Sequence, residues 1–305
     1  MRILTLFLDG IGLGADDPAT NPFAAANTPT LIGLTGGRRW LAGAGKHASD
    51  RAVFVPTDAL LDVDGYPQSG SGQASLLTGL NVPSLIGRHY GPKPDKQTRE
   101  IITEHSYFRS LTKRGLRARL LTAYPPRLLA DFERGKTLRS SIQQAAFESG
   151  QPHLTLSDLM QRRALTAEWT TDSWRRHLHF RNLPQYSPRE AGRLLARLAR
   201  KYDFAFHSHW LTDRIGHRGA VSDGVAVLER FDAVLAGVLE EWDGDSGLVV
   251  ITSDHGNMED LSTRRHTLNP VPTLIIGRRA AEFAEGYTCL ADFVPACDRM
   301  LFDTR

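Results

Sequence analysis

Short apolar runs alternate with amphipathic stretches along this chain. The apolar runs predict buried strands, because a strand covered on both faces reads as continuous apolar sequence. They span residues 2–8, 52–56, 117–123, 203–211, 247–254 and 271–277. A 3.6-residue period and proline or glycine boundaries predict helices over residues 72–80, 97–113, 137–149, 156–164, 188–201, 224–242 and 290–302. This alternation is typical of an α/β protein with a mainly parallel sheet flanked by helices.

One stretch interrupts the alternation. Residues 124–187 contain the least strand-like sequence of the chain and begin with a run that includes Pro125 and Pro126. We therefore expect a small inserted cap over 124–187 and a core formed by residues 1–123 and 188–305.

Composition places the chain among ordinary globular proteins. It has 305 residues, of which 41% are hydrophobic and 23% charged, which excludes wholesale disorder, a collagen-like chain and a disulfide scaffold. No apolar run reaches the roughly 18 residues that a membrane helix needs, and residues 2–8 are interpreted as a strand, not a signal peptide. The two cysteines, Cys289 and Cys297, have no zinc or redox spacing, so a reducing, cytoplasmic setting without a membrane partner is expected.

The net charge of +3 conceals an uneven distribution. Residues 88–200 hold 22 of the 37 lysines and arginines but only 10 of the 34 acidic residues. A basic middle suggests contact with an anion, whereas the alternative is an arginine-rich, solvated surface. Nucleic acid is not indicated, because aromatic residues are not interleaved with the basic ones.

Metal-type ligands occur at four places, each beside a predicted strand. They are Asp9 after the first strand, Asp213 and His217 in a D-x-x-x-H spacing, the adjacent pair Asp254 and His255, and His266 in a proline-containing loop. Each alone has an ordinary alternative: a turn carboxylate, a surface pair or a surface histidine. The ends of parallel strands gather at one edge of a sheet, so together they predict a single site.

The set of three aspartates and three histidines exceeds what one catalytic ion uses. It therefore predicts two divalent ions, which can clamp the attacking and leaving oxygens of a phosphoryl group. Oxygen and imidazole ligands without thiolate suit manganese, zinc or magnesium. A Gly/Ser-rich turn at a predicted helix start offers Ser69 or Ser71 as a nucleophile, although such a turn is often only a turn.

Five ordered motifs resemble the metalloenzyme branch of the alkaline phosphatase superfamily, which includes cofactor-independent phosphoglycerate mutase and phosphopentomutase. They are FLDGIG, PQSGSGQASLLTG, D-x-x-x-H, SDHGN and HTLNPVP. The resemblance implies an alkaline-phosphatase-like core with an inserted cap and two divalent ions, of which manganese is the first expectation. It implies one ion held by Asp213, His217 and His266, and a second held by Asp9, Ser69, Asp254 and His255. Ser69 matches the phosphorylated nucleophile of the family.

The chain departs from the mutases in that branch. Gln73 stands where they carry histidine, and the chain is too short for the large second domain of the phosphoglycerate enzyme. We therefore expect a two-metal phosphatase acting on a small anionic phosphate ester. A phosphomutase and a non-catalytic metal-binding protein remain the alternatives. Arg88 and His89, just after the nucleophile helix, are the expected substrate contacts, and the oligomeric state stays open.

The glycine-rich turn after the first strand could also indicate a dinucleotide-binding fold. The GIGLG after the first strand has the spacing G-x-G-x-G and lacks the acidic residue that would bind a ribose. The Walker-type phosphate loop and the G-x-S-x-G hydrolase elbow are also absent from the sequence.

Overall fold

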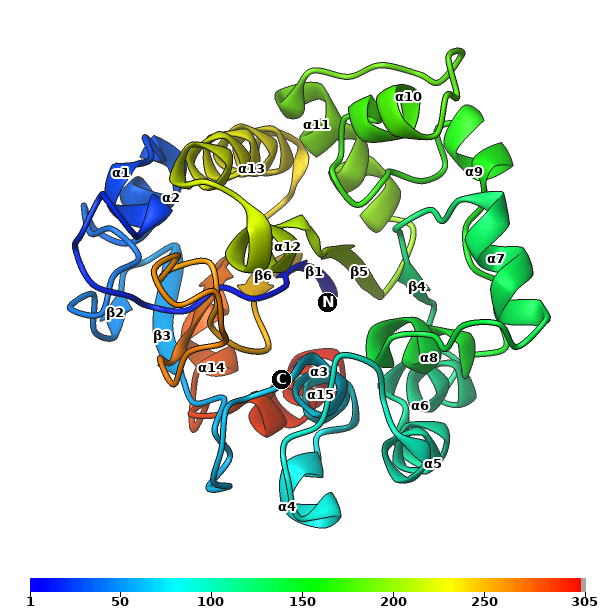
Figure 1. Ribbon diagram of the computed structural model, residues 1–305, viewed down its shortest axis with the longest axis horizontal. Coiled ribbons are helices and arrows are strands. Elements are labelled where there is room, and N and C mark those ends of the chain that lie inside the picture. The colour runs from blue at the N-terminus through cyan, green and yellow to red at the C-terminus, as the bar shows by residue number, and fades with distance from the viewer. Residues whose placement is uncertain (303–305) are drawn as a thin grey trace.

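A seven-stranded sheet forms the centre of the computed structural model, which describes residues 1–302 (Figure 1). Its strand order is β2-β3-β7-β6-β1-β5-β4. The strands are β1 (Arg2–Leu8), β2 (His47–Ala48), β3 (Ala52–Thr57), β4 (Ala118–Leu120), β5 (Phe204–His209), β6 (Gly247–Thr252) and β7 (Val271–Ile276).

Four adjacent strands, β6, β1, β5 and β4, pair in parallel, whereas the remaining three strands are joined to the sheet by antiparallel pairs. β1 pairs in parallel with both β5 and β6, with Leu6 opposite His207 on one side and Ile251 on the other. β4 continues the parallel part beyond β5, whereas β7, β3 and β2 are joined by antiparallel pairs. The predicted α/β class is therefore confirmed, with an antiparallel extension on one side.

Helices cover the sheet and its edges. They are α1 (Pro22–Ala25), α2 (Pro29–Leu34), α3 (Ser69–Thr78), α4 (Val82–Ile86), α5 (Lys96–His105), α6 (Tyr107–Lys113), α7 (Pro126–Glu133), α8 (Ser141–Phe147), α9 (Leu156–Met160), α10 (Asp172–His177), α11 (Pro188–Ala199), α12 (Leu211–Arg218), α13 (Val221–Glu241), α14 (Ala280–Phe283), η1 (Leu290–Asp292) and α15 (Phe293–Phe302). Within residues 1–302, none has the length and apolar content that crossing a bilayer requires.

The two faces of the sheet carry two separate apolar clusters. Alternate residues of β1 show this division, because successive strand side chains point to opposite faces. Leu4 and Leu6 belong to the cluster that includes α11 and α13, whereas Ile3 and Phe7 belong to the cluster that includes α3 and α15. Figure 1 shows α13 on one side of the strands and α3 with α15 on the other. Burial on both faces explains why the strands read as continuous apolar runs.

Helix boundaries differ from the sequence prediction where a side chain caps the backbone. The single helix predicted over 97–113 is divided at Ser106, whose hydroxyl accepts from the N–H of Arg109 and so begins α6. The D-x-x-x-H spacing of Asp213 and His217 lies on the eight-residue helix α12, which no predicted helix covers.

The segment 124–187 runs beside the β4 edge. Isolated parallel bridges join Thr122 to Leu165 and Ala123 to Leu154. The segment contributes Trp169 to one apolar cluster and Ile142 to the other. In Figure 1, α7, α9 and α10 lie along the β4 side of the molecule. The division into a cap and a core stays a prediction.

Four arginines of the basic segment form surface ion pairs with α13. Arg189 and Arg193 on α11 contact Glu240, and Arg197 and Arg200 contact Glu241. Exposed pairs of this kind contribute little to stability. Part of the positive charge of residues 88–200 therefore belongs to an arginine-rich, solvated surface, which is the alternative to contact with an anion.

The close approach of α11 to α13 generates a prediction. A Cβ atom at Gly192 would overlap the carbonyl oxygen of Val234, whereas one at Gly33 on α2 would meet nothing within 4 Å. We expect Gly192→Ala to lower the free energy of unfolding by about 2 kcal/mol because the helices must separate. Gly33→Ala is the matched control and should raise it by about 0.5 kcal/mol. Chemical denaturation measures both; equal effects would contradict the packing described.

Candidate active site

Three neighbouring strands end at one edge and place the acidic residues together. Asp9 directly follows β1, and its N–H donates to the carbonyl of His209 at the end of β5, 2.9 Å away. Asp254 and His255 follow β6, the other neighbour of β1. The three strands are parallel, so these residues share the carboxyl edge, where open α/β sheets gather their ligands.

Helix α12 brings Asp213 and His217 to the same edge. The two residues lie one turn apart, and their Oδ1 and Nε2 atoms are 3.5 Å from each other. The approach of α12 to the β1 turn depends on Gly10, which has φ of +67°. A Cβ atom there would lie 2.8 Å from Oδ1 of Asp213. Only glycine satisfies both the backbone angle and the contact.

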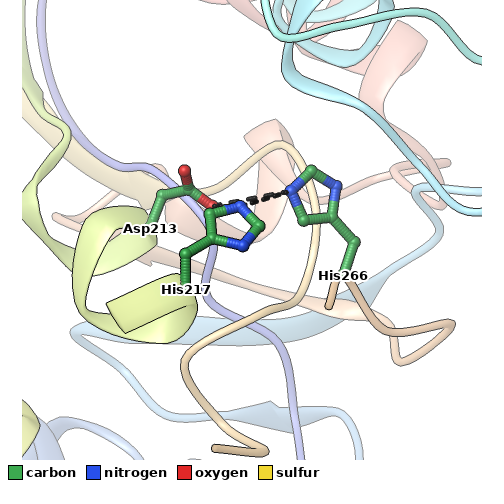
Figure 2. A group of neighbouring side chains, drawn as sticks. All are labelled: Asp213, His217 and His266. Atoms are coloured by element: carbon green, nitrogen blue, oxygen red, sulfur yellow. Dashed lines mark hydrogen bonds and ion pairs between the residues drawn. The ribbon is translucent and has the colours of Figure 1, made fainter. Parts of the chain in front are cut away.

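His266 completes a group of three with Asp213 and His217. Figure 2 shows the three side chains pointing toward one another, two from α12 and one from the loop before β7. Nε2 of His266 lies 3.6 Å from Oδ1 of Asp213 and 3.3 Å from Nε2 of His217. The imidazole of His266 also stacks on that of His255, with ring centres 3.8 Å apart.

Backbone carbonyls fix which nitrogen of these histidines faces the group. Nδ1 of His266 lies 2.6 Å from the carbonyl oxygen of Pro67, and Nδ1 of His217 lies 3.1 Å from that of Arg264. Each Nδ1 therefore donates to a carbonyl oxygen, and the two Nε2 atoms face each other. Burial, then the neighbouring His255, lowers the pKa of His266 to about 4, so its ring is neutral at pH 7. This is the arrangement that metal-bound histidines adopt.

Ser69 faces a second group of side chains. It is the first residue of α3, and its Oγ lies 2.9 Å from Nε2 of His255. The same Nε2 lies 3.5 Å from Oδ1 of Asp9 and 3.6 Å from Oδ2 of Asp254. Ser71, the other serine considered, instead pairs with Tyr90 through its N–H and its hydroxyl. Of the two hydroxyls, that of Ser69 contacts the site.

Burial and mutual repulsion disfavour the charges of the carboxylates in this group. Burial, then the charges of Asp254 and Asp213, raises the pKa of Asp9 well above its usual range. Oδ1 of Asp9 is buried without a hydrogen-bond partner. Ligand atoms of Asp9, Asp213 and His255 lie within 4.8 Å of one another, as do those of Asp213, His217 and His266. A buried carboxylate oxygen without a hydrogen-bond partner, 3.5 Å from an imidazole nitrogen of His255, fits a divalent cation.

Gln73 links two of the carboxylates. Its Nε2 donates to Oδ2 of Asp9 at 3.2 Å and to Oδ2 of Asp254 at 3.0 Å. The residue at which the chain departs from the mutase pattern therefore lies inside the site and orients two acidic side chains.

Sequence reasoning missed Asn257 and Lys93. The amide of Asn257 donates to Oδ1 of Asp213 at 2.7 Å, and its place in the SDHGN motif was the available signal. Burial lowers the pKa of Lys93, while the charge of Asp9 opposes that shift. The backbone of Lys93 packs on α3, since a Cβ at Gly70 would lie 3.0 Å from its carbonyl oxygen.

The expected substrate contacts have partners of their own. Arg88 forms an exposed ion pair with Asp95 at 2.9 Å, and Nε2 of His89 lies 3.1 Å from the carbonyl oxygen of Val63. Their role in substrate binding stays a prediction.

Comparison with known families agrees with the motifs. Residues 185–298 match the model of the Metalloenzyme superfamily. Similar curated proteins are 2,3-bisphosphoglycerate-independent phosphoglycerate mutases. That of Methylobacillus flagellatus is 32% identical over 111 residues, which is 34% of this chain and 22% of the relative. That of Thiobacillus denitrificans is 36% identical over 117 residues, which is 36% of this chain and 23% of the relative. The match thus spans less than a quarter of the length of either relative.

Solved structures show the same fold at low identity. The PH0037 protein from Pyrococcus horikoshii has a TM-score of 0.55 at 16% identity and covers 100% of this chain and 97% of its own. A phosphoglycerate mutase from Leishmania mexicana has a TM-score of 0.50 at 13% identity, and the match covers 98% of this chain and 95% of the mutase chain. A variant of the TAB5 alkaline phosphatase has a TM-score of 0.50 at 12% identity, and the match covers 100% of this chain and 98% of the phosphatase chain. The alkaline-phosphatase-like fold is therefore confirmed, and so is the resemblance of the motifs to the metalloenzyme superfamily, whose model matches residues 185–298.

Proposed function

We propose that this protein is a metal-dependent phosphatase that transfers the phosphoryl group of a small phosphomonoester to Ser69 and then to water. The observation that carries the proposal is the convergence of Nε2 atoms from three histidines, carboxylates from three aspartates and the hydroxyl of Ser69 at one sheet edge. Metal-assisted phosphoryl transfer requires this combination of a hydroxyl nucleophile and hard ligands.

The ligands divide into two sets. Asp213, His217 and His266 would hold one divalent ion, and Asp9, Asp254, His255 and Ser69 would hold the other. Bound divalent ions lower the pKa of a serine hydroxyl and neutralise the charge of phosphoryl oxygens. Manganese remains the first expectation, with zinc or magnesium as alternatives.

Ser69 supplies the attacking oxygen. It occupies the first turn of α3, where the helix dipole favours an anion. The hydroxyl of Ser69 loses its proton to solvent, a bond forms between Oγ and phosphorus as the bond to the leaving oxygen breaks, and the leaving oxygen takes up a proton to become the alcohol. In the second step the oxygen of water bonds to phosphorus and gives up a proton, the bond to Oγ breaks, Oγ regains a proton, and inorganic phosphate leaves. Lys93 is the candidate contact for the anionic ester.

Exposure of the site favours water over a second alcohol as the acceptor. The side chains of His217 and Asp213 are 39% and 23% exposed. A mutase must keep its phosphorylated intermediate away from water. The exposed side chains of Asp213 and His217 leave this side of the site accessible to water. A phosphomutase is the second candidate, because the curated relatives are named as phosphoglycerate mutases. A metal-binding protein without activity is the third, and the hydroxyl of Ser69 inside the site argues against it.

Replacement of Ser69 tests the nucleophile. We expect Ser69→Ala to lower kcat by about a thousandfold or more, because no other hydroxyl takes its place. Ser71→Ala in the same helical turn is the matched control and should stay within about tenfold of wild type. The measurement is phosphate release with Mn²⁺ from sugar phosphates, phosphoglycerates and nucleotides. Equal turnover by Ser69→Ala would refute the phosphoserine route, and isomerised product without free phosphate would identify a mutase.

Metal titration tests the ligand sets. After treatment with a chelator, the wild-type protein should bind two equivalents of Mn²⁺ in calorimetry. His217→Ala should keep only one tight site, because it removes a ligand of the first set alone. Retention of two tight sites by this variant would contradict the assignment, and a wild-type protein that binds no divalent ion would contradict the proposed function.

Lys93 tests recognition of the anion. A charge-assisted hydrogen bond contributes about 1.5–3 kcal/mol, so Lys93→Ala should raise KM about tenfold or more with a smaller change in kcat. Lys96→Ala is the control, because Lys96 is exposed and lies 3.8 Å from Glu100. An unchanged KM for Lys93→Ala would exclude Lys93 as a phosphate contact.

A further inference from the structure

Glu259 is a buried carboxylate that the proposed chemistry does not use. Its side chain is 1% exposed and accepts from four donors. Oε2 accepts from the N–H groups of Gly12 at 2.8 Å and Asn257 at 2.7 Å. Oε1 accepts from the hydroxyl of Thr267 and from the amide of Asn269, the latter at 3.1 Å. All four partners are donors, so the side chain accepts in every contact, as an ionised carboxylate does.

The donors come from the three loops that carry the candidate ligands. Gly12 lies three residues after Asp9 in the loop that follows β1. Asn257 lies two residues after His255 in the loop that follows β6. Thr267 directly follows His266 in the loop before β7. One side chain therefore fixes the relative positions of three segments that are distant in the sequence.

The fit around this carboxylate is tight. A Cβ atom at Gly12 or at Gly256 would overlap Oε1 of Glu259. Two glycines thus let the backbones of the first two loops approach the carboxylate closely enough for its hydrogen bonds.

The charge of Glu259 has no basic partner. Among residues 1–302, no lysine or arginine lies within ion-pair distance of it. A buried charge without a counter-ion is costly, and neutral donors offset only part of that cost.

We propose that Glu259 is a positioning residue of the metal centre. It holds the loops of Asp9, His255 and His266 in the arrangement that binds divalent ions, and it does not itself coordinate them. The inference rests on the proposed function only in requiring that the site binds metal.

Asp232 provides a matched control. It is also buried, at 4% exposed, and its two oxygens accept from the N–H groups of Thr30 at 3.1 Å and Leu31 at 2.8 Å. These contacts join α13 to α2 and include no candidate ligand. Loss of its charge therefore reports on stability alone.

The experiment compares Glu259→Gln with Asp232→Asn in the full-length protein. Calorimetry with Mn²⁺ on chelator-treated protein gives the dissociation constants, and thermal unfolding of the metal-free protein gives Tm. Both variants should lower Tm. Only Glu259→Gln should weaken Mn²⁺ binding, by about tenfold to a hundredfold, as loss of a residue that orients metal ligands does; Asp232→Asn should stay within twofold of wild type.

Asn269→Ala is the second variant and removes a single donor to Glu259. It should weaken Mn²⁺ binding twofold to fivefold, and it decides the question if Glu259→Gln does not fold. Wild-type affinity in Asn269→Ala and in any folded Glu259→Gln would overturn the positioning role. If the wild-type protein binds no Mn²⁺, Zn²⁺ or Mg²⁺, the proposed function fails instead, so the two failures are distinguishable.

Discussion

Mutual repulsion of buried carboxylates is the constraint on which the site depends. Asp9, Asp213 and Asp254 gather at one edge of the sheet, and the pKa of Asp9 rises because burial and its two neighbours disfavour its charge. Such a cluster needs either protons or cations. The neutral imidazole of His266, whose pKa is lowered to about 4, offers a lone pair beside Asp213, which favours a cation as the compensating charge.

The fold holds this unfavourable arrangement by means of its backbone. The parallel strands β6, β1 and β5 lie side by side and end together, which fixes where the acidic residues emerge. Carbonyl groups of Pro67 and Arg264 then set the tautomers of His266 and His217. Gln73 and Asn257 orient the carboxylates from opposite sides. The tight apolar packing on both faces of the sheet supplies the rigidity that such a site needs.

Part of the positive charge of residues 88–200 lies at the surface. Four of its arginines pair there with Glu240 and Glu241 of α13. Lys93, by contrast, is partly buried, and the charge of Asp9 acts on it. For the proposed function, the local surroundings of this lysine are therefore a more specific indication of anion binding than the net charge of the segment.

The sequence by itself determined six of the seven strands, the α/β class and the positions of the metal-type residues, because apolar runs, strand-end motifs and their order are local properties of the chain; the two-residue β2 has no such run. The helix break at Ser106 and the antiparallel β7 and β3 were not predictable, since capping contacts and strand direction depend on neighbouring segments. The resemblance already favoured Ser69 over Ser71, and the tertiary structure adds the contact of Ser69 with His255, which no local pattern gives. Glu259 gave no signal, because it accepts from backbone and side-chain groups of loops that meet only after folding; its bond to the N–H of Gly12 spans 247 positions.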